Sequence, residues 1–152
     1  MKIFQAGLQH SDELAGLFNQ YRVFYKKKSN PEACRVFLVE RLENDQSIIF
    51  AAQGSSGTLQ GFTQLYQSFC SVELRPLIYL YDLFVEPAAR RSGMARALME
   101  AARQYAVEQG ADRLQLETAI DNATAQALYD NLGYKRDTEF YTYHLLLTDP
   151  PA

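Results

Sequence analysis

One stretch of the chain constrains its fold more than any other: an apolar segment, a short basic turn and a long helical segment follow one another directly. Residues 77–85 are rich in Ile, Leu, Tyr and Phe, which is typical of a buried strand. Pro87 ends this segment, residues 93–109 then place apolar side chains at helical spacing, and Gly110 is a C-cap. The sequence therefore predicts a strand that leads into a helix through a turn.

The remaining segments extend this pattern along the chain. Ser11 and Pro31 suit the first residues of helices. The other predicted elements are strands at 2–6, 47–52 and 59–69, the last two joined by a Gly/Ser turn, then a strand at 113–118, a helix at 122–131 and a final strand at 139–147. This order predicts one α/β domain over residues 1–152, in which a mixed sheet carries helices on its faces.

Length, charge and cysteine content exclude several classes of protein. The chain has 152 residues, which suits one domain, and a net charge of -3, which disfavours a nucleic-acid binder. Cys34 and Cys70 do not form a C-x-x-C pair, so both are expected to be reduced thiols in a cytoplasmic protein. No signal core or membrane-spanning apolar run is present, and no metal site is predicted.

The basic turn, Arg90-Arg91-Ser92-Gly93-Met94-Ala95, lies where the long helix begins. The first N–H groups of a helix lack internal acceptors and carry partial positive charge, so a phosphate can bind there. Gly93 and Ala95 leave room for a pyrophosphate, and Arg96 adds a cation. A glycine and a few arginines are common at helix starts, so the turn alone does not establish a site. It matches neither a P-loop nor a dinucleotide-binding motif.

Two motifs together resemble the GNAT acetyltransferase superfamily. Residues 90–95 are similar to its R/Q-x-x-G-x-G/A motif, with Ala95 in the final glycine position. Residues 122–134 resemble its N-x-x-A-x-x-L-Y-x-x-L-G-F/Y motif, in the family's order and spacing. The resemblance is sharp from about residue 52 to 134. It implies a mixed, mostly antiparallel sheet with helices on both faces and a splay between two central strands, 77–85 and 113–118.

The resemblance also implies an activity and the residues that bind its cofactor. The enzyme would transfer acetyl from acetyl-CoA to a primary amine by direct attack in a ternary complex. The residues implied to hold acetyl-CoA are Leu83, Phe84, Val85, Arg90, Arg91, Ser92, Gly93, Met94, Ala95, Asn122 and Tyr129. The first three would act through their main chain. Asn122 also suits an N-cap of its helix.

The chemistry of acetyl transfer requires a base and an acid. A free alkyl ammonium has a pKa of about 10, so it must lose a proton before it attacks. By resemblance, Tyr129 is the acid that protonates the departing thiolate. Asp82 and Glu117, on the two splayed strands, are alternative candidates for the base, either of which could relay the proton through water. A hydrogen-bonded structural carboxylate is an equally good interpretation of each.

The sequence does not identify the amine that accepts the acetyl group. Residues 61–85 resemble the spermidine/spermine, thialysine and histone/polyamine acetyltransferase branch, but Tyr81 replaces a carboxylate of the polyamine enzymes. Lys26-Lys27-Lys28 is either a solvated helix end or part of a pocket that suits an amine carrying a carboxylate, such as an amino acid or diamino acid. The alternatives are a protein or peptide N-acetyltransferase and a non-catalytic acyl-CoA-binding module. A homodimer is expected, with residues 140–143 as one possible contact.

Overall fold

The computed structural model describes residues 1–149, and the chain forms two compact units. The first unit spans Met1–Glu117, and the second begins at Thr118. The first contains β1 (Lys2–Gln5), α1 (Ser11–Phe24), α2 (Pro31–Glu43), β2 (Ile48–Gln53), β3 (Leu59–Cys70), β4 (Arg75–Val85), α3 (Met94–Glu108) and β5 (Leu114–Gln115), with single 3-10 turns at Leu8–His10 and Pro87–Ala89. The second contains α4 (Ala123–Asn131).

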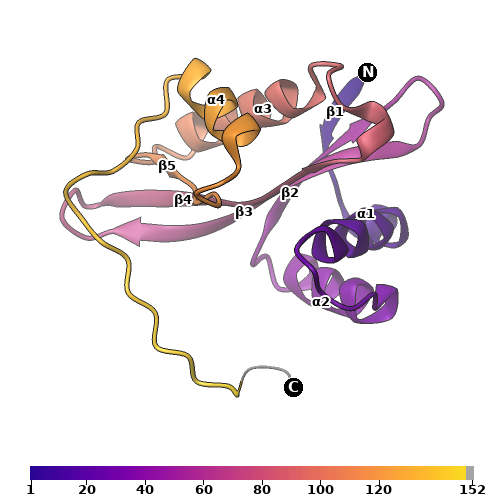
Figure 1. Cartoon of the computed structure of the whole chain (residues 1–152), viewed down its shortest axis with the longest axis horizontal. Coiled ribbons are helices and arrows are strands. Elements are labelled where there is room, and N and C mark those ends of the chain that lie inside the picture. The colour runs from indigo at the N-terminus through magenta and orange to yellow at the C-terminus, as the bar shows by residue number, and fades with distance from the viewer. Residues whose placement is uncertain (150–152) are drawn as a thin grey trace. The chain divides into compact units, whose positions relative to one another are not determined.

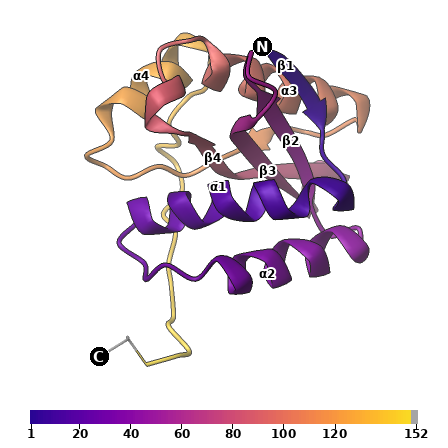
Figure 2. The same ribbon diagram turned by 90° about the vertical axis from the view of Figure 1, so that its right-hand side faces the viewer.

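The five strands form one sheet in the order β1-β2-β3-β4-β5. The pairings among β1, β2, β3 and β4 are antiparallel, and β4 pairs with β5 in parallel. Helices α1 and α2 lie on one face of this sheet and α3 lies on the other (Figure 1). Figure 2 shows α1 and α2 side by side. The predicted mixed, mostly antiparallel sheet with helices on both faces is confirmed.

Alternating side chains of β2 separate the core into two layers. Ile49 and Ala51 are fully buried against α1 and α2, whereas Ala52 is buried on the other side with Leu98 of α3. Successive side chains of a strand point to opposite faces, so one apolar strand supplies both layers. The dense apolar run that predicted a buried strand therefore reflects burial on both faces.

The helix starts follow the chemistry of their first residues. Pro31 is the first residue of α2, where its missing N–H has no consequence. The Asn30 side chain caps this helix, because its Oδ1 accepts from the Ala33 N–H at 3.1 Å. Within residues 1–149, no helix has the length and apolarity that a membrane span requires.

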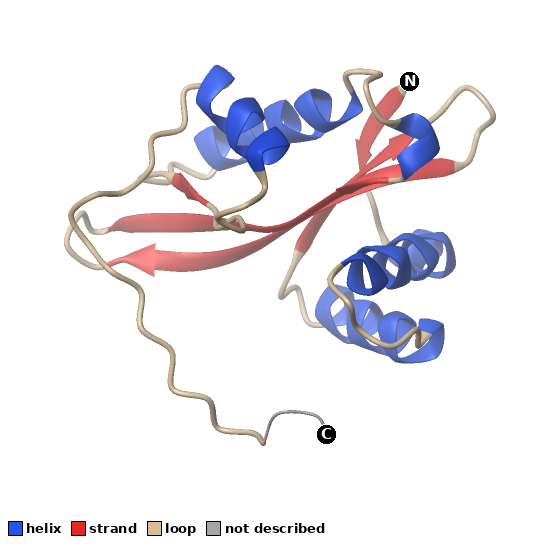
Figure 3. Cartoon of the chain, viewed as in Figure 1, coloured by secondary structure: helices blue, strands red, loops and turns tan. Residues whose placement is uncertain are grey.

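The predicted final strand at 139–147 is wrong. Residues 135–149 form a loop, which Figure 3 colours tan throughout. The Asp137 Oδ1 accepts from the N–H groups of Glu139 and Phe140, at 2.8 and 3.3 Å, and this local turn competes with strand pairing. An apolar pattern makes a strand only where backbone groups find a partner strand, and the described residues supply none here.

The contact between β3 and α3 leaves no room for a side chain at Gly61. A Cβ built there would lie 3.0 Å from the Phe84 carbonyl oxygen and 3.2 Å from the Met94 Sδ. We expect Gly61→Ala to lower the free energy of unfolding by about 1–3 kcal/mol, because the Phe84 backbone cannot move aside easily. Chemical denaturation of both proteins measures this change.

Gly16→Ala is the matched control. Gly16 is exposed in α1, and a Cβ there would meet nothing within 4 Å. Alanine is the better helix former, so this variant should gain about 0.5–1 kcal/mol. Equal effects of the two substitutions would contradict the close approach of β3, β4 and α3 at Gly61.

Candidate active site

Asp82 is a carboxyl group buried within the sheet's packed layers. It lies on β4, and only 6% of its surface is exposed. Its Oδ2 accepts a hydrogen bond from Gln64 Nε2 at 2.9 Å, and the Tyr21 side chain of α1 is a second hydrogen-bond partner. Burial raises the pKa of Asp82, and the hydrogen bonds from Gln64 and Tyr21 oppose this rise. A carboxylate with a raised pKa accepts a proton more readily than an ordinary one.

A β-bulge lies directly beside Asp82. Gln64 pairs with Asp82 and Leu65 pairs with Leu80, so Tyr81 is an extra residue on β4. Bulges bend a strand and redirect its side chains, and they are common next to active sites. Here the Tyr81 ring lies 5.4 Å from the ring of Tyr66 and is 68% exposed. The bulge therefore places a solvent-facing aromatic ring next to the buried carboxyl group.

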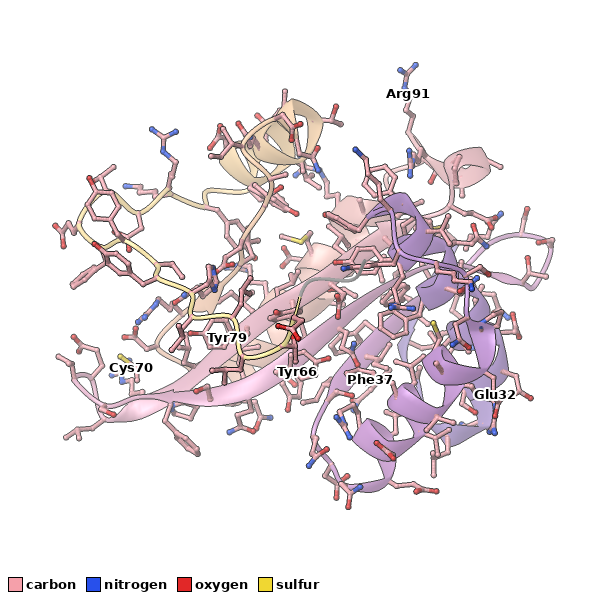
Figure 4. The ribbon with its side chains drawn as sticks, turned by 60° about the horizontal axis from the view of Figure 1, so that its bottom comes forward. Glu32, Phe37, Tyr66, Cys70, Tyr79 and Arg91 are labelled. Carbon is pink, nitrogen blue, oxygen red and sulfur yellow. The ribbon has the colours of Figure 1, made fainter. Side chains whose placement is uncertain are left out.

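Tyr66 joins the same cluster from β3, where it is paired with Tyr79 of β4 (Figure 4). Burial raises the pKa of Tyr66, and the nearby charge of Asp82 raises it further, whereas Arg41 of α2 lowers it. The Tyr66 hydroxyl group is therefore protonated at neutral pH. It can donate one hydrogen bond to a bound molecule without releasing its proton.

The basic turn before α3 adopts a conformation suited to an anion. Arg91 and Gly93 both have left-handed backbones, with φ of 63° and 83°. Left-handed residues in a turn can direct neighbouring N–H groups toward one concave surface. The first helical bond runs from the Ala97 N–H to the Gly93 carbonyl at 3.0 Å, so the N–H groups of residues 94–96 precede the intrahelical ladder.

The arginines of this turn have different surroundings. Arg90 Nε donates to the Val85 carbonyl at 3.0 Å, and its guanidinium lies 5.8 Å from the centre of the Phe24 ring. Arg90 therefore joins the end of β4 to the end of α1. The Arg91 side chain is exposed and points away from the ribbon in Figure 4. Ser92 Oγ donates to the Ala89 carbonyl at 2.7 Å and fixes the turn itself.

The edge of β4 beyond Tyr79 has no strand partner on its β5 side within residues 1–117. Pairing with β5 is confined to Ile78 with Leu114 and Tyr79 with Gln115. The divergence of these two strands is the predicted splay. Backbone N–H and C=O groups along an unpaired strand edge are available to a ligand.

The turn and the open edge fit the two ends of coenzyme A. A pyrophosphate suits the left-handed turn with its first-turn N–H groups and its arginines. An extended arm that carries amides suits the unpaired backbone of residues 80–85. The side chains of Phe84 and Val85 are buried in the core, so any role of theirs in binding is through the main chain.

The remaining predicted site residues are Glu117 of the first unit and Asn122 and Tyr129 of the second. Glu117 is exposed, follows β5 by two residues and makes no hydrogen bond within residues 1–149, so it is not part of the Asp82 cluster. Asn122 and Tyr129 belong to the second unit. There Asn122 Oδ1 caps α4 by accepting from the Ala125 N–H at 3.2 Å, and the Tyr129 ring lies 6.0 Å from that of Tyr134.

A hollow of about 520 Å³ lies between the end of α1 and the start of α2. Arg22 and Lys28 line it, and none of its lining side chains is acidic. Asn19 anchors the connecting loop, because its side chain bonds to the Ser29 hydroxyl and to the Asn30 N–H, at 3.1 and 2.8 Å. The lining residues are Phe18, Arg22, Lys28, Ser29, Asn30, Ala33, Cys34 and Phe37.

One aromatic contact links this hollow to Asp82. The Phe18 ring lies 6.3 Å from the Tyr21 ring, and Tyr21 is a hydrogen-bond partner of Asp82. Of the three lysines that the sequence singled out, only Lys28 lines the hollow.

Comparison with known proteins decides the family. Residues 13–134 match the model of the Acetyltransferase (GNAT) family. The chain belongs to this family. It is 43% identical over 145 residues to an uncharacterised N-acetyltransferase, YhfO, of Bacillus subtilis, an alignment that covers 95% of this chain and 97% of the relative. A crystal structure of a probable acetyltransferase matches with 42% identity and a TM-score of 0.93, covering 99% of this chain and all of that one.

A more distant relative has a named substrate class. The D-amino-acid N-acetyltransferase HPA3 of Saccharomyces cerevisiae is 26% identical over 144 residues, which cover 92% of this chain and 89% of the relative. With the family established, the chain is an acyltransferase with the GNAT fold.

Two neighbours of Asp82 were missed from sequence. Gln64 and Tyr66 lie in the strand Gly61-Phe62-Thr63-Gln64-Leu65-Tyr66, where a fully buried glutamine is the unusual feature. A polar residue that alternates with apolar ones predicts exposure, not burial, so only the tertiary structure shows that Gln64 is buried opposite Asp82.

The raised pKa of Asp82 predicts a distinctive effect of pH on stability. Since the folded pKa lies above the unfolded value of about 3.9, the contribution of Asp82 to stability is present below that value and is lost as pH rises through the folded pKa. Asp82→Asn should therefore match or exceed the wild type in free energy of unfolding at pH 8. If Asp82 is the base, the turnover of Asp82→Asn should also fall at least about 100-fold.

Glu117→Gln provides the comparison for this prediction. Denaturation at pH 5 and pH 8, with turnover at the same pH values, is measured for both variants. Because Glu117 is exposed, Glu117→Gln should leave the free energy of unfolding unchanged at either pH. A large loss of turnover in Glu117→Gln, with Asp82→Asn nearly as active as the wild type, would assign the base to Glu117.

Proposed function

We propose that this GNAT protein transfers acetyl from acetyl-CoA to the primary amine of a small molecule, and that Asp82 receives the proton of that amine. The observation that carries the proposal is the buried Asp82 carboxyl group with its raised pKa, next to a bulge and on the strand whose other edge is open. Asp82, the bulge and the open edge all lie within the first unit. Acetyl-CoA supplies the activated acetyl thioester.

The proton transfer follows from the environment of Asp82. An ammonium of pKa about 10 gives its proton to an ordinary carboxylate only at a large free-energy cost. Burial raises the pKa of Asp82 and so reduces that cost. We propose Asp82 over Glu117 as the base, because Glu117 is exposed and stands outside the cluster.

The remaining roles are proposals that rest on the motifs. Residues 90–95 hold the pyrophosphate, and the main chain of residues 83–85 holds the extended arm and polarises the thioester carbonyl. Asn122 contributes a hydrogen bond to the same arm. Tyr129, the tyrosine of the second motif, is the acid that donates to the departing thiolate, since a phenol of pKa about 10 suits that task.

For the acceptor, we propose a small amine that also carries a carboxylate. The hollow beside α1 and α2 is lined by Arg22 and Lys28 with no acidic side chain, which favours an anionic group and disfavours a polyamine. The relative that acts on D-amino acids supports this class of acceptor. Membership of the spermidine/spermine and thialysine branch stays a prediction. So do a single domain over residues 1–152, a cytoplasmic location and a homodimer.

The first test is release of thiol from acetyl-CoA by the wild type and by Tyr129→Phe, over amino acids, diamino acids, polyamines, an aminoglycoside and basic peptides. We expect Tyr129→Phe to lower kcat by about 100-fold or more, because the acid is lost, while coenzyme A binding is kept. Calorimetry with coenzyme A provides the control for binding.

Three outcomes would contradict the proposal. Preference for basic peptides would indicate a peptide N-acetyltransferase. Tight binding of coenzyme A with no turnover of any amine would indicate a non-catalytic acyl-CoA-binding module. Full activity of Tyr129→Phe would remove Tyr129 from the mechanism.

Neutralising the hollow tests the class of acceptor. Arg22→Gln combined with Lys28→Gln removes both cations, so KM for an amine that carries a carboxylate should rise by about tenfold or more. KM for a matched amine without the carboxylate should stay within about twofold. Lys26→Gln is the control, because Lys26 lies in the same loop but does not line the hollow. Equal KM changes for both amines would contradict the proposal that the acceptor carries a carboxylate.

A further inference from the structure

The hollow between α1 and α2 has two kinds of lining. Arg22 and Lys28 supply positive charge, which matches a carboxylate. Its apolar lining comes from Phe18, Ala33, Cys34 and Phe37. The volume of about 520 Å³ lies within the range of about 300–1,000 Å³ that is usual for small-molecule sites. A carboxylate accounts for the two cations, so the apolar lining is available to another part of the ligand.

The two aromatic rings of the hollow are held by their neighbours. The rings of Phe18 and Phe37 lie 5.8 Å apart, with their planes inclined by 35°. The Arg41 guanidinium lies 4.8 Å from the centre of the Phe37 ring, and the buried Phe62 ring meets Phe18 edge-on at 6.1 Å. Because their neighbours already fix these rings, they need little ordering when a ligand packs against them.

The neutral polar side chains of the hollow are already hydrogen-bonded within the protein. Asn30 Oδ1 accepts from the Ala33 N–H, and Ser29 Oγ accepts from the Asn19 side-chain amide, both at 3.1 Å. These bonds cap α2 and fix the loop before it. No acidic side chain is among the described lining residues. A ligand with many hydroxyl or amino groups therefore finds few side-chain acceptors there.

An amino acid with an apolar side chain matches both kinds of lining. Its carboxylate suits Arg22 and Lys28, and its side chain suits the rings of Phe18 and Phe37. Its amino group must stay uncovered to attack the thioester, so it needs no partner in the hollow. We infer that the hollow selects amino acids with a bulky aliphatic or aromatic side chain, and that Phe18 and Phe37 determine this preference. This inference rests on the proposed function and adds a class of side chain to it.

The same lining disfavours other amino acids. One methylene group more or less in an apolar pocket changes kcat/KM by about 10- to 200-fold, so a small side chain that leaves the rings uncovered should be a poor match. A diamino acid would bring a second ammonium group beside Arg22 and Lys28 with no acidic partner. The preferred acceptor therefore has one amino group.

The first measurement is kcat/KM of the wild type for alanine, serine, leucine, phenylalanine and lysine, each as both enantiomers. All five carry the same carboxylate and α-amino group, so differences among them report on the side chain. We expect leucine and phenylalanine to exceed alanine and serine by about tenfold or more in the preferred enantiomer. Equal values for all five, or a preference for lysine, would overturn the inference.

Two variants test whether the hollow sets this preference. Ala33→Leu fills part of the hollow and keeps a good helix former in α2, so kcat/KM for phenylalanine should fall by about tenfold or more. Phe37→Ala removes one ring and should lower kcat/KM for phenylalanine more than for alanine. Val36→Leu is the control, because Val36 is exposed on the same helix and does not line the hollow.

The variants also decide where the side chain binds. A wild-type preference for phenylalanine that both variants leave unchanged would mean that the side chain binds elsewhere, which would overturn the inference. If Phe37→Ala does not fold, Ala33→Leu decides this point alone, because its new side chain projects from a residue that is exposed.

The outcomes separate this inference from the proposed function. Turnover of amines that carry a carboxylate, without preference among their side chains, would overturn the inference and leave the proposed function intact. Equal turnover of amines with and without a carboxylate would overturn the proposed acceptor and the inference together. No turnover of any amine would overturn the proposed function, and this inference with it.

Discussion

The antiparallel pairing of β3 with β4 is the interaction on which the rest of the structure depends. It joins residues 61–70 to residues 75–85, and α1 and α3 pack on its opposite faces. The bulge at Tyr81 interrupts this pairing beside Asp82. The far edge of β4 then binds β5 over only two residues. One pairing therefore sets the position of the carboxyl group and leaves the neighbouring backbone edge open.

Asp82 is held in a balance of opposing effects. Burial favours its neutral form, whereas hydrogen bonds from Gln64 and Tyr21 favour its charge. A buried carboxyl group does not improve stability, since an apolar residue would be easier to bury. A destabilising buried charge of this kind is typical of functional sites. The burial of Asp82 is therefore stronger evidence for a functional role than its position on β4.

The sequence predicted most of the fold, whereas the roles of the candidate site residues stay predictions. The turn at residues 90–95, the helix after it and the Asn122 cap lie where the local chemistry placed them, because caps and turns depend on neighbouring residues. The final strand was wrong, because strand formation depends on a distant partner and Asp137 favours a local turn. Gln64 and Tyr66 were missed, because nothing near them in sequence marks them as neighbours of Asp82.

By itself, the sequence determined most of the elements, their order, the basic turn before α3 and the family, because these depend on local propensity and on motifs within short segments. Only the tertiary structure distinguished Asp82 from Glu117, gave Gln64 a buried oxygen without a partner and formed the cationic hollow at Arg22 and Lys28. The physical reason is that burial and hydrogen-bond partners belong to residues far apart in the chain. The burial of a side chain and its hydrogen-bond partners are set only when the strands pair and the helices pack against them.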